Sequence, residues 1–151
     1  MTPETQTTTP ADFISLMQSR GARLTPAPSA KKISLTNAAL RQNRQAMLPK
    51  TLTDIYEITG TINLDTGYIF GPNSIERMGT FPIPDILSIN NDIATYNKTN
   101  GMTIFGRNDL FWFAYDAFGT FYMLDNLSLK PLRKYNDVYR AITDCLMAGK
   151  I

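Results

Sequence analysis

Three aspartates stand where carboxylates could do chemistry. Asp109 and Asp116 flank the aromatic run 110–115, and Asp125 closes the next run. Paired carboxylates can act as general acid and base or can bind a metal ion. At strand ends, however, Asp more often accepts hydrogen bonds from nearby backbone N–H groups in turns. We therefore interpret all three as turn residues first, and keep Asp109 and Asp116 as candidate contacts for a partner.

The residue types that most often drive catalysis are scarce in this chain. It has no histidine, which is the commonest general base near neutral pH and the commonest metal ligand. The single cysteine, Cys145, has no histidine to activate it, and we interpret it as a small buried apolar residue. We therefore expect no catalytic residues, no cofactor and no metal site. An enzyme that uses Asp, Tyr and Lys is the open alternative.

The stretch Phe105-Gly106-Arg107-Asn108-Asp109 looks like the start of a glycine-rich phosphate loop. It lacks a second glycine, a Lys-Ser/Thr pair and a following helix, so the phosphate interpretation fails. We predict instead that Gly106 forms a bend or bulge between two strands.

Trp112, with Phe111 and Phe113 beside it, is the residue most suggestive of a recognition surface. Aromatic side chains on a sheet can stack on RNA bases, but that mode of binding needs basic residues among the aromatics. Only Arg107 is basic nearby, so core packing is the better account. Since three successive strand residues cannot all face one way, helices or a partner must cover at least one face. We keep Trp112, with Asp109 and Asp116, as a candidate partner contact.

These residues belong to the segment 105–125, which holds eight of the sixteen aromatic residues of the chain. Its pattern predicts two strands, 110–115 and 120–124, joined by a turn in which Gly119 supplies a positive φ. Such an apolar hairpin needs cover, so we expect it at the centre of a sheet flanked by helices. The predicted fold class is α+β, with a mostly antiparallel sheet around a central hairpin of about 102–125.

Apolar spacing and helix breakers divide the rest of the chain within a single globular unit. We expect a polar leader at 1–10, N-terminal helices with a Pro-rich connector at 11–47, and a domain at 48–151. The expected helices cover 11–20, 36–47 (capped by Ser34 or Thr36), 48–60, 84–98 and 137–147. The further expected strands cover 68–70, 102–105 and the edge strand 130–135, with 74–78 left open between a strand and a helical turn.

Composition is that of a globular protein, with 43% apolar residues and no run near the roughly 20 apolar residues of a membrane span. One cysteine and no charged-then-apolar leader predict a cytosolic protein without membrane attachment. Residues 1–50 have seven basic and two acidic side chains, whereas 51–151 have eight and eleven. The acidic, sheet-bearing half favours basic partners and disfavours nucleic acid. Nucleic-acid binding through residues 1–50 is the open alternative.

The order of these segments resembles the SMI1/KNR4-like (SUKH) superfamily over about 48–146. Leu48–Gly60 is similar to the entry helix of that superfamily, in which Leu-Pro precedes a helix that ends at glycine. Residues 104–125 are similar to its central strands, and the segment from Tyr135 onward to its closing strand and helix. Thr59 stands where Asn is usual, and the resemblance does not account for the helices before residue 48.

The resemblance implies an α+β binding domain without an active site. Many bacterial members resemble immunity proteins that neutralise polymorphic toxins by direct binding, and others are intracellular scaffolds or regulators. We therefore expect a non-enzymatic immunity protein whose partner is a basic toxin domain such as a nuclease, because charge complementarity speeds association. A scaffold or regulatory protein is the alternative, and an incompletely covered aromatic sheet would favour homo-oligomers.

Overall fold

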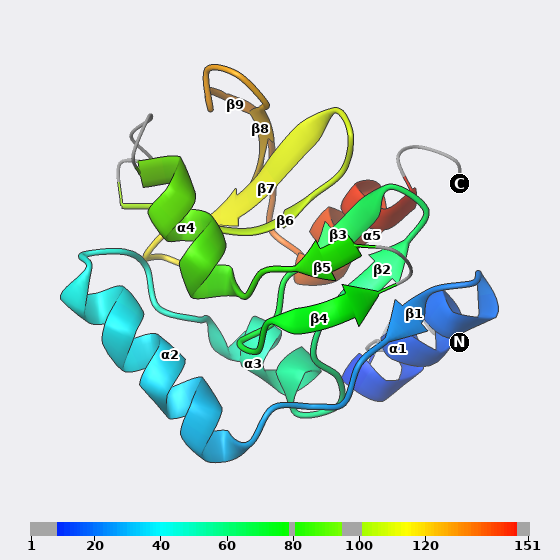
Figure 1. The fold of residues 1–151 in the computed structure, drawn as a ribbon. Coiled ribbons are helices and arrows are strands. Elements are labelled where there is room, and N and C mark those ends of the chain that lie inside the picture. Colours follow the sequence, from blue (N-terminus) through cyan, green and yellow to red (C-terminus); the bar gives the residue numbers. More distant parts are fainter. Residues whose placement is uncertain (1–8, 79–80, 95–100, 148–151) are drawn as a thin grey trace, which may run out of the picture.

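The chain has the α+β fold class that its sequence predicts. The computed structural model describes residues 9–78, 81–94 and 101–147. These residues form five helices, a seven-stranded antiparallel sheet and a two-stranded ribbon (Figure 1). None of the described helices is long and apolar enough to cross a membrane. The helices are α1 (Pro10–Ser19), α2 (Ala30–Gln42), α3 (Lys50–Tyr56), α4 (Ile86–Ala94) and α5 (Val138–Met147).

The seven strands have the order β1-β2-β3-β6-β7-β8-β9, and all neighbouring pairs are antiparallel. The predicted aromatic hairpin is β7–β8, and Gly119 in its turn has a φ of 80°. The predicted edge strand is β9, where Pro131 is tolerated. The strands are β1 (Arg23–Leu24), β2 (Ile62–Leu64), β3 (Gly67–Ile69), β6 (Thr103–Arg107), β7 (Phe111–Tyr115), β8 (Phe121–Asp125) and β9 (Pro131–Tyr135), with β4 (Ile75–Met78) and β5 (Phe81–Ile83) in the ribbon.

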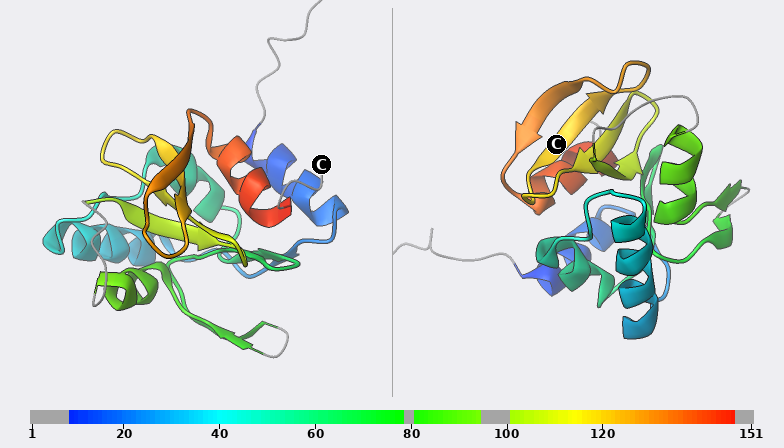
Figure 2. Two further views of the ribbon diagram at one scale, coloured as in Figure 1. Left: turned by 90° about the horizontal axis from the view of Figure 1, so that it is seen from above. Right: turned by 90° about the vertical axis from the view of Figure 1, so that its left-hand side faces the viewer.

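Different elements cover the two faces of the sheet, as the left view of Figure 2 shows. We call the side covered by α5 and α1 the back face, and the side of α4 and the β4–β5 ribbon the front face. On the back face, Phe105 and Phe121 lie edge to face with ring centroids 5.4 Å apart, and Phe113 stacks on Tyr135 at 6.5 Å. All four rings are buried, so the aromatic segment is mainly core, as predicted.

Helix α5 approaches the back face very closely. A Cβ atom on Gly67 would lie 2.5 Å from the carbonyl oxygen of Cys145, so this approach requires glycine. The buried Cys145 sulfur lies 3.5 and 3.4 Å from the carbonyl oxygens of Tyr68 and Arg107, which share its single S–H donor. Burial raises the pKa of this thiol well above its usual value. Cys145 is therefore the small buried residue that the sequence predicts.

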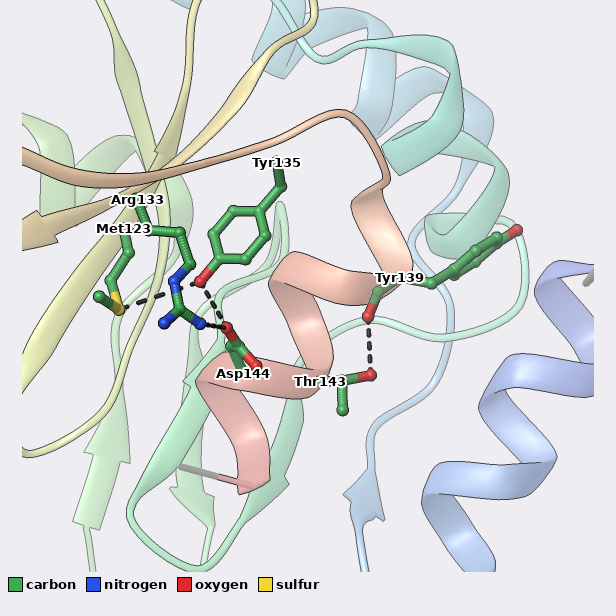
Figure 3. A network of polar contacts seen from close by, with 6 residues as sticks. All are labelled: Met123, Arg133, Tyr135, Tyr139, Thr143 and Asp144. Atoms are coloured by element: carbon green, nitrogen blue, oxygen red, sulfur yellow. Dashed lines mark hydrogen bonds and ion pairs between the residues drawn. The ribbon is translucent and has the colours of Figure 1, made fainter. Parts of the chain in front are cut away.

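A polar network attaches the edge strand β9 to α5 (Figure 3). Asp144 of α5 accepts a hydrogen bond from the Tyr135 hydroxyl at 2.6 Å and pairs with the Arg133 guanidinium at 2.9 Å. The Tyr135 hydroxyl also lies 3.9 Å from the sulfur of Met123. Burial is the main cause that raises the Tyr135 pKa above its ordinary value, and the hydrogen bond to Asp144 is the next. This network holds the edge strand β9 against α5 on the back face.

On the front face, the Asn90 side chain links α4 to the sheet by hydrogen bonds. β3 pairs with β6 only at Gly106 and Arg107, and the chain after β3 then turns away from the sheet. The backbone N–H and carbonyl of Ile104 on that side of β6 therefore face α4 instead of a neighbouring strand. Asn90 replaces the strand: its Oδ1 accepts from the Ile104 N–H and its Nδ2 donates to the Ile104 carbonyl, both at 2.8 Å. The register of β6 against β7 shifts between Ile104 and Gly106, next to the glycine at which a bend or bulge was predicted, but Gly106 lies within β6 rather than between two strands.

The expected bounds of the second helix are wrong. α2 begins at Ala30, with Ser29 as its N-cap, because the Ser29 hydroxyl accepts from the Lys32 N–H at 3.0 Å. The helix ends at Gln42 rather than 47, because Arg44 has a left-handed φ of 60° and the backbone of Ala46 is held by hydrogen bonds to residues distant in sequence. Neither Ser34 nor Thr36 is the cap.

Other differences concern short elements. β2 and β5 are three residues each, too short for a readable alternation, and were not expected. The open segment 74–78 forms β4, and α3 ends at Tyr56 rather than Gly60. The expected leader residues 1–8 and the helix residues 95–98 lie outside the described residues. Residues 11–47 are built into the sheet and core, because β1 pairs with β2 and the apolar face of α1 is buried.

Candidate functional site

The front face contains a groove of about 650 Å³. It lies between the strands β3 and β6 on one side and the segment joining β5 to α4 on the other. A concave, mostly apolar site of this size is typical of a binding site. We call it the front-face groove; its main lining residues are Asp65, Tyr68, Ile83, Ile89, Arg107 and Asp109.

The floor of the front-face groove is apolar. Ile83 and Phe70 are buried, whereas Tyr68 and Ile89 are half-buried and keep part of their surface open. The carbonyl oxygen of Phe70 accepts a hydrogen bond from the buried Tyr56 hydroxyl. This bond fixes the point where the chain leaves β3, so the floor is held in place without a ligand.

The β6–β7 turn forms one end of the rim, and its neighbouring residues Asn108 and Asp109 have different roles. Asn108 Oδ1 accepts from the N–H groups of Leu110 and Phe111 at 2.9 and 2.8 Å, so Asn108 stabilises the turn. Asp109 has one hydrogen bond among the described residues, in which the Thr66 hydroxyl donates to its Oδ1 at 3.3 Å. The turn interpretation therefore does not apply to Asp109, whose carboxylate lines the groove instead.

Trp112 lies beside the groove but is covered. The residue is 8% exposed, and the Arg107 guanidinium carbon lies 4.5 Å from the centroid of its ring. The two residues are directly opposite on β6 and β7, so the sheet register fixes this cation–π contact. No carboxylate of the described residues pairs with Arg107. A partner would therefore meet a guanidinium supported by the indole rather than an open aromatic ring.

Asp116 lies beyond the other end of β7, roughly 20 Å from Asp109 at the rise of a strand. Its Oδ1 accepts from the N–H groups of Phe118 and Thr120 at 2.9 and 3.0 Å, and its Oδ2 from the Tyr122 hydroxyl at 2.9 Å. Partial burial raises its pKa, but these hydrogen bonds outweigh burial and hold the pKa below its ordinary value. The turn interpretation of Asp116 is confirmed.

The structure therefore separates the three predicted contacts. Asp109 and the Arg107-covered Trp112 lie at the groove end of β7, whereas Asp116 lies at the opposite end beside a second hollow of about 410 Å³. Asp125 is a turn residue as well, since its Oδ2 accepts from the Ser128 N–H at 2.8 Å. Of the three candidates, Asp109 is the one that lines the front-face groove.

Sequence reasoning missed most of the groove. Tyr68 was assigned to a strand and Ile89 to a helix face, whereas Ile83 lay outside every expected element, and no local signal brings the three together. Arg107 was noted as the basic residue near Trp112, and their pairing follows only from the register of β6 against β7. The groove could not be found without the sheet order.

The front-face groove combines an apolar floor with the Asp109 carboxylate at its rim. In the part of the chain that the structure describes, no three His, Cys, Asp or Glu side chains are grouped so that they could hold a metal ion. Comparison with known proteins adds no assignment: no family model, no curated protein and no solved structure matches this chain.

Proposed function

We propose that this chain is a non-enzymatic immunity protein of the SMI1/KNR4-like type, which neutralises a basic toxin domain by binding it directly. The observation that carries the proposal is the front-face groove, which places an apolar floor beside the Asp109 carboxylate. Specific protein interfaces combine a buried apolar centre with a polar rim, and a few anchored side chains supply most of the binding energy.

The side chains that could act chemically have structural roles, which supports a binding function. The Cys145 thiol is buried and bonded to backbone carbonyls, and Asp116 accepts three hydrogen bonds within its hairpin. The Tyr56 hydroxyl is buried and fixes the end of β3. These groups stabilise the scaffold that presents the groove.

The order of elements supports the resemblance to the SMI1/KNR4-like superfamily. α3 begins directly after Leu48-Pro49, the aromatic hairpin follows as β7–β8, and α5 closes the chain against the back face. An antiparallel sheet with a closing helix is what the resemblance implies for residues 48–146.

The test is co-expression of the full chain with the products of the genes adjacent to its own. We expect that one adjacent product is toxic alone, that this chain restores growth, and that the two proteins co-purify as a complex. Because the proposed partner is basic, binding should weaken as ionic strength rises. A toxin of the same activity from an unrelated locus serves as the control. Absence of both binding and protection would refute the proposal.

A further inference from the structure

We propose that the front-face groove binds an extended segment of the toxin, with one cationic side chain at Asp109 and a neighbouring apolar side chain on the groove floor. This inference rests on the proposed function and specifies the chemistry of its binding site. It makes Asp109 and Ile89 specificity-determining residues, and it gives Arg107 a separate role toward the backbone of the bound segment.

The cationic side chain is inferred from the acidic end of the rim. Asp109 Oδ1 accepts from Thr66, and no described residue bonds its Oδ2, so one carboxylate oxygen is available to a partner. Asp65, next to Thr66 in the β2–β3 turn, lines the same groove. The Thr66–Asp109 bond therefore brings the two turns together at one end of the groove. A lysine or arginine placed there gains a charge-assisted hydrogen bond.

The apolar side chain is inferred from the floor. Tyr68 and Ile89 are partly open to solvent above the buried Ile83 and Phe70. An aliphatic side chain placed on this floor would remove apolar surface from water on both partners, which contributes about 25 cal/mol for each Å². A volume of about 650 Å³ accommodates such a side chain together with the backbone that bears it.

Arg107 limits what else can bind. Its guanidinium is held over Trp112 at 4.5 Å, and no carboxylate among the described residues pairs with it. Its N–H groups can donate to backbone carbonyls of an extended segment. The same charge repels a second cation, so the groove should favour one basic residue between apolar residues over a run of basic residues.

Synthetic peptides test this chemistry without the toxin. The probes are acetylated, amidated Gly-Leu-Arg-Leu-Gly, its variant with Glu in place of Arg, and Gly-Arg-Arg-Arg-Gly, each titrated into the full isotope-labelled chain and followed by NMR. We expect the Leu-Arg-Leu peptide to bind most tightly, with amide shifts centred on Tyr68 and Arg107–Asp109. Equal binding of the Glu peptide, tightest binding of the triple-arginine peptide, or shifts centred elsewhere would overturn the inference.

Matched variants isolate the carboxylate. Asp109→Asn keeps an acceptor for Thr66 and removes the charge, and we expect it to weaken the Leu-Arg-Leu peptide roughly tenfold. The control is Asp12→Asn, which removes an exposed carboxylate on α1, on the back-face side of the sheet. This substitution should leave binding unchanged. Equal effects of the two substitutions would contradict the inference.

Binding to the toxin separates this inference from the proposed function. Asp109→Lys and Ile89→Glu should each weaken the toxin complex at least tenfold. Lysine at 109 would repel the cationic side chain of the toxin, and glutamate at 89 would place a charge on the apolar floor that the toxin covers. Thermal melting checks folding, and Ile89→Ala replaces Ile89→Glu if the latter unfolds. A toxin that binds these variants as tightly as the native chain refutes the groove and leaves the function standing. Peptide binding at the groove without any toxin partner refutes the function and leaves the groove chemistry standing.

Discussion

The two faces of the sheet are built in opposite ways. On the back face, α5 lies against glycine, aromatic rings fill the space, and the Tyr135–Asp144–Arg133 network closes the edge. On the front face, α4 and the β4–β5 ribbon leave a groove, with charged side chains at its rim. The back face is thus closed by its helix and rings, whereas the front face leaves apolar surface and charge available for a partner.

The comparison predicts large losses of stability where backbone or buried polar groups are disturbed, and small losses around the groove. The exception on the front face is Asn90, whose side chain bonds the backbone of Ile104 in β6. The variants below run from the largest expected effect to the smallest.

Asn90→Leu should have the largest effect. Asn90 is 1% exposed and satisfies both the N–H and the carbonyl of Ile104. Leucine leaves these two buried groups without partners, and we expect a loss of about 4 kcal/mol in the free energy of unfolding. Urea denaturation measures it. A loss below 1 kcal/mol would show that this side chain does not anchor α4. The front face would then be less firmly attached to the sheet than the structure indicates.

Gly67→Ala should be next, on the back face. The new Cβ would meet the Cys145 carbonyl oxygen and the Leu146 Cα at 2.5 and 2.7 Å, and both belong to the backbone of α5. α5 must move, at a cost of about 3 kcal/mol. The midpoint of urea unfolding measures the change. An unchanged midpoint would mean that α5 is not closely packed, which would remove the main contrast between the faces.

Tyr135→Phe and Tyr122→Phe form a matched pair across the two faces. The Tyr135 hydroxyl is bonded to Asp144 on the back face, and the Tyr122 hydroxyl is bonded to Asp116 on the front. We expect Tyr135→Phe to cost about 1.5 kcal/mol and Tyr122→Phe about 0.5 kcal/mol, because Tyr122 is the more exposed of the two. The reverse order in thermal or urea melts would contradict the comparison.

Arg107→Gln should have the smallest effect on stability, about 0.5 kcal/mol, because it removes only a cation–π contact at the surface. Trp112 is the only tryptophan of the chain, so the tryptophan fluorescence comes from this one site. We expect the emission to shift to longer wavelength as the indole gains exposure to water. An unchanged spectrum would show that Arg107 does not cover Trp112 in solution.

Local patterns predicted the central strands, the closing helix and the α+β class. The Asp116–Gly119 turn was readable because its hydrogen bonds join residues two to four apart, and Gly119 supplies the positive φ. The bounds of α2 were not, because contacts of Ala46 with Gly101 and Thr103 end the helix region. The front-face groove was not readable either.

The sequence by itself determined the composition of the core, the hairpin and the scarcity of catalytic side chains. These properties depend on residue types and on neighbours a few positions apart. Only the tertiary structure decided that Asp109 lines the front-face groove, that Arg107 covers Trp112, and that Tyr68, Ile83 and Ile89 share a floor. Those relations depend on sheet order, strand register and the departure of the chain after β3, which bring together residues far apart in sequence.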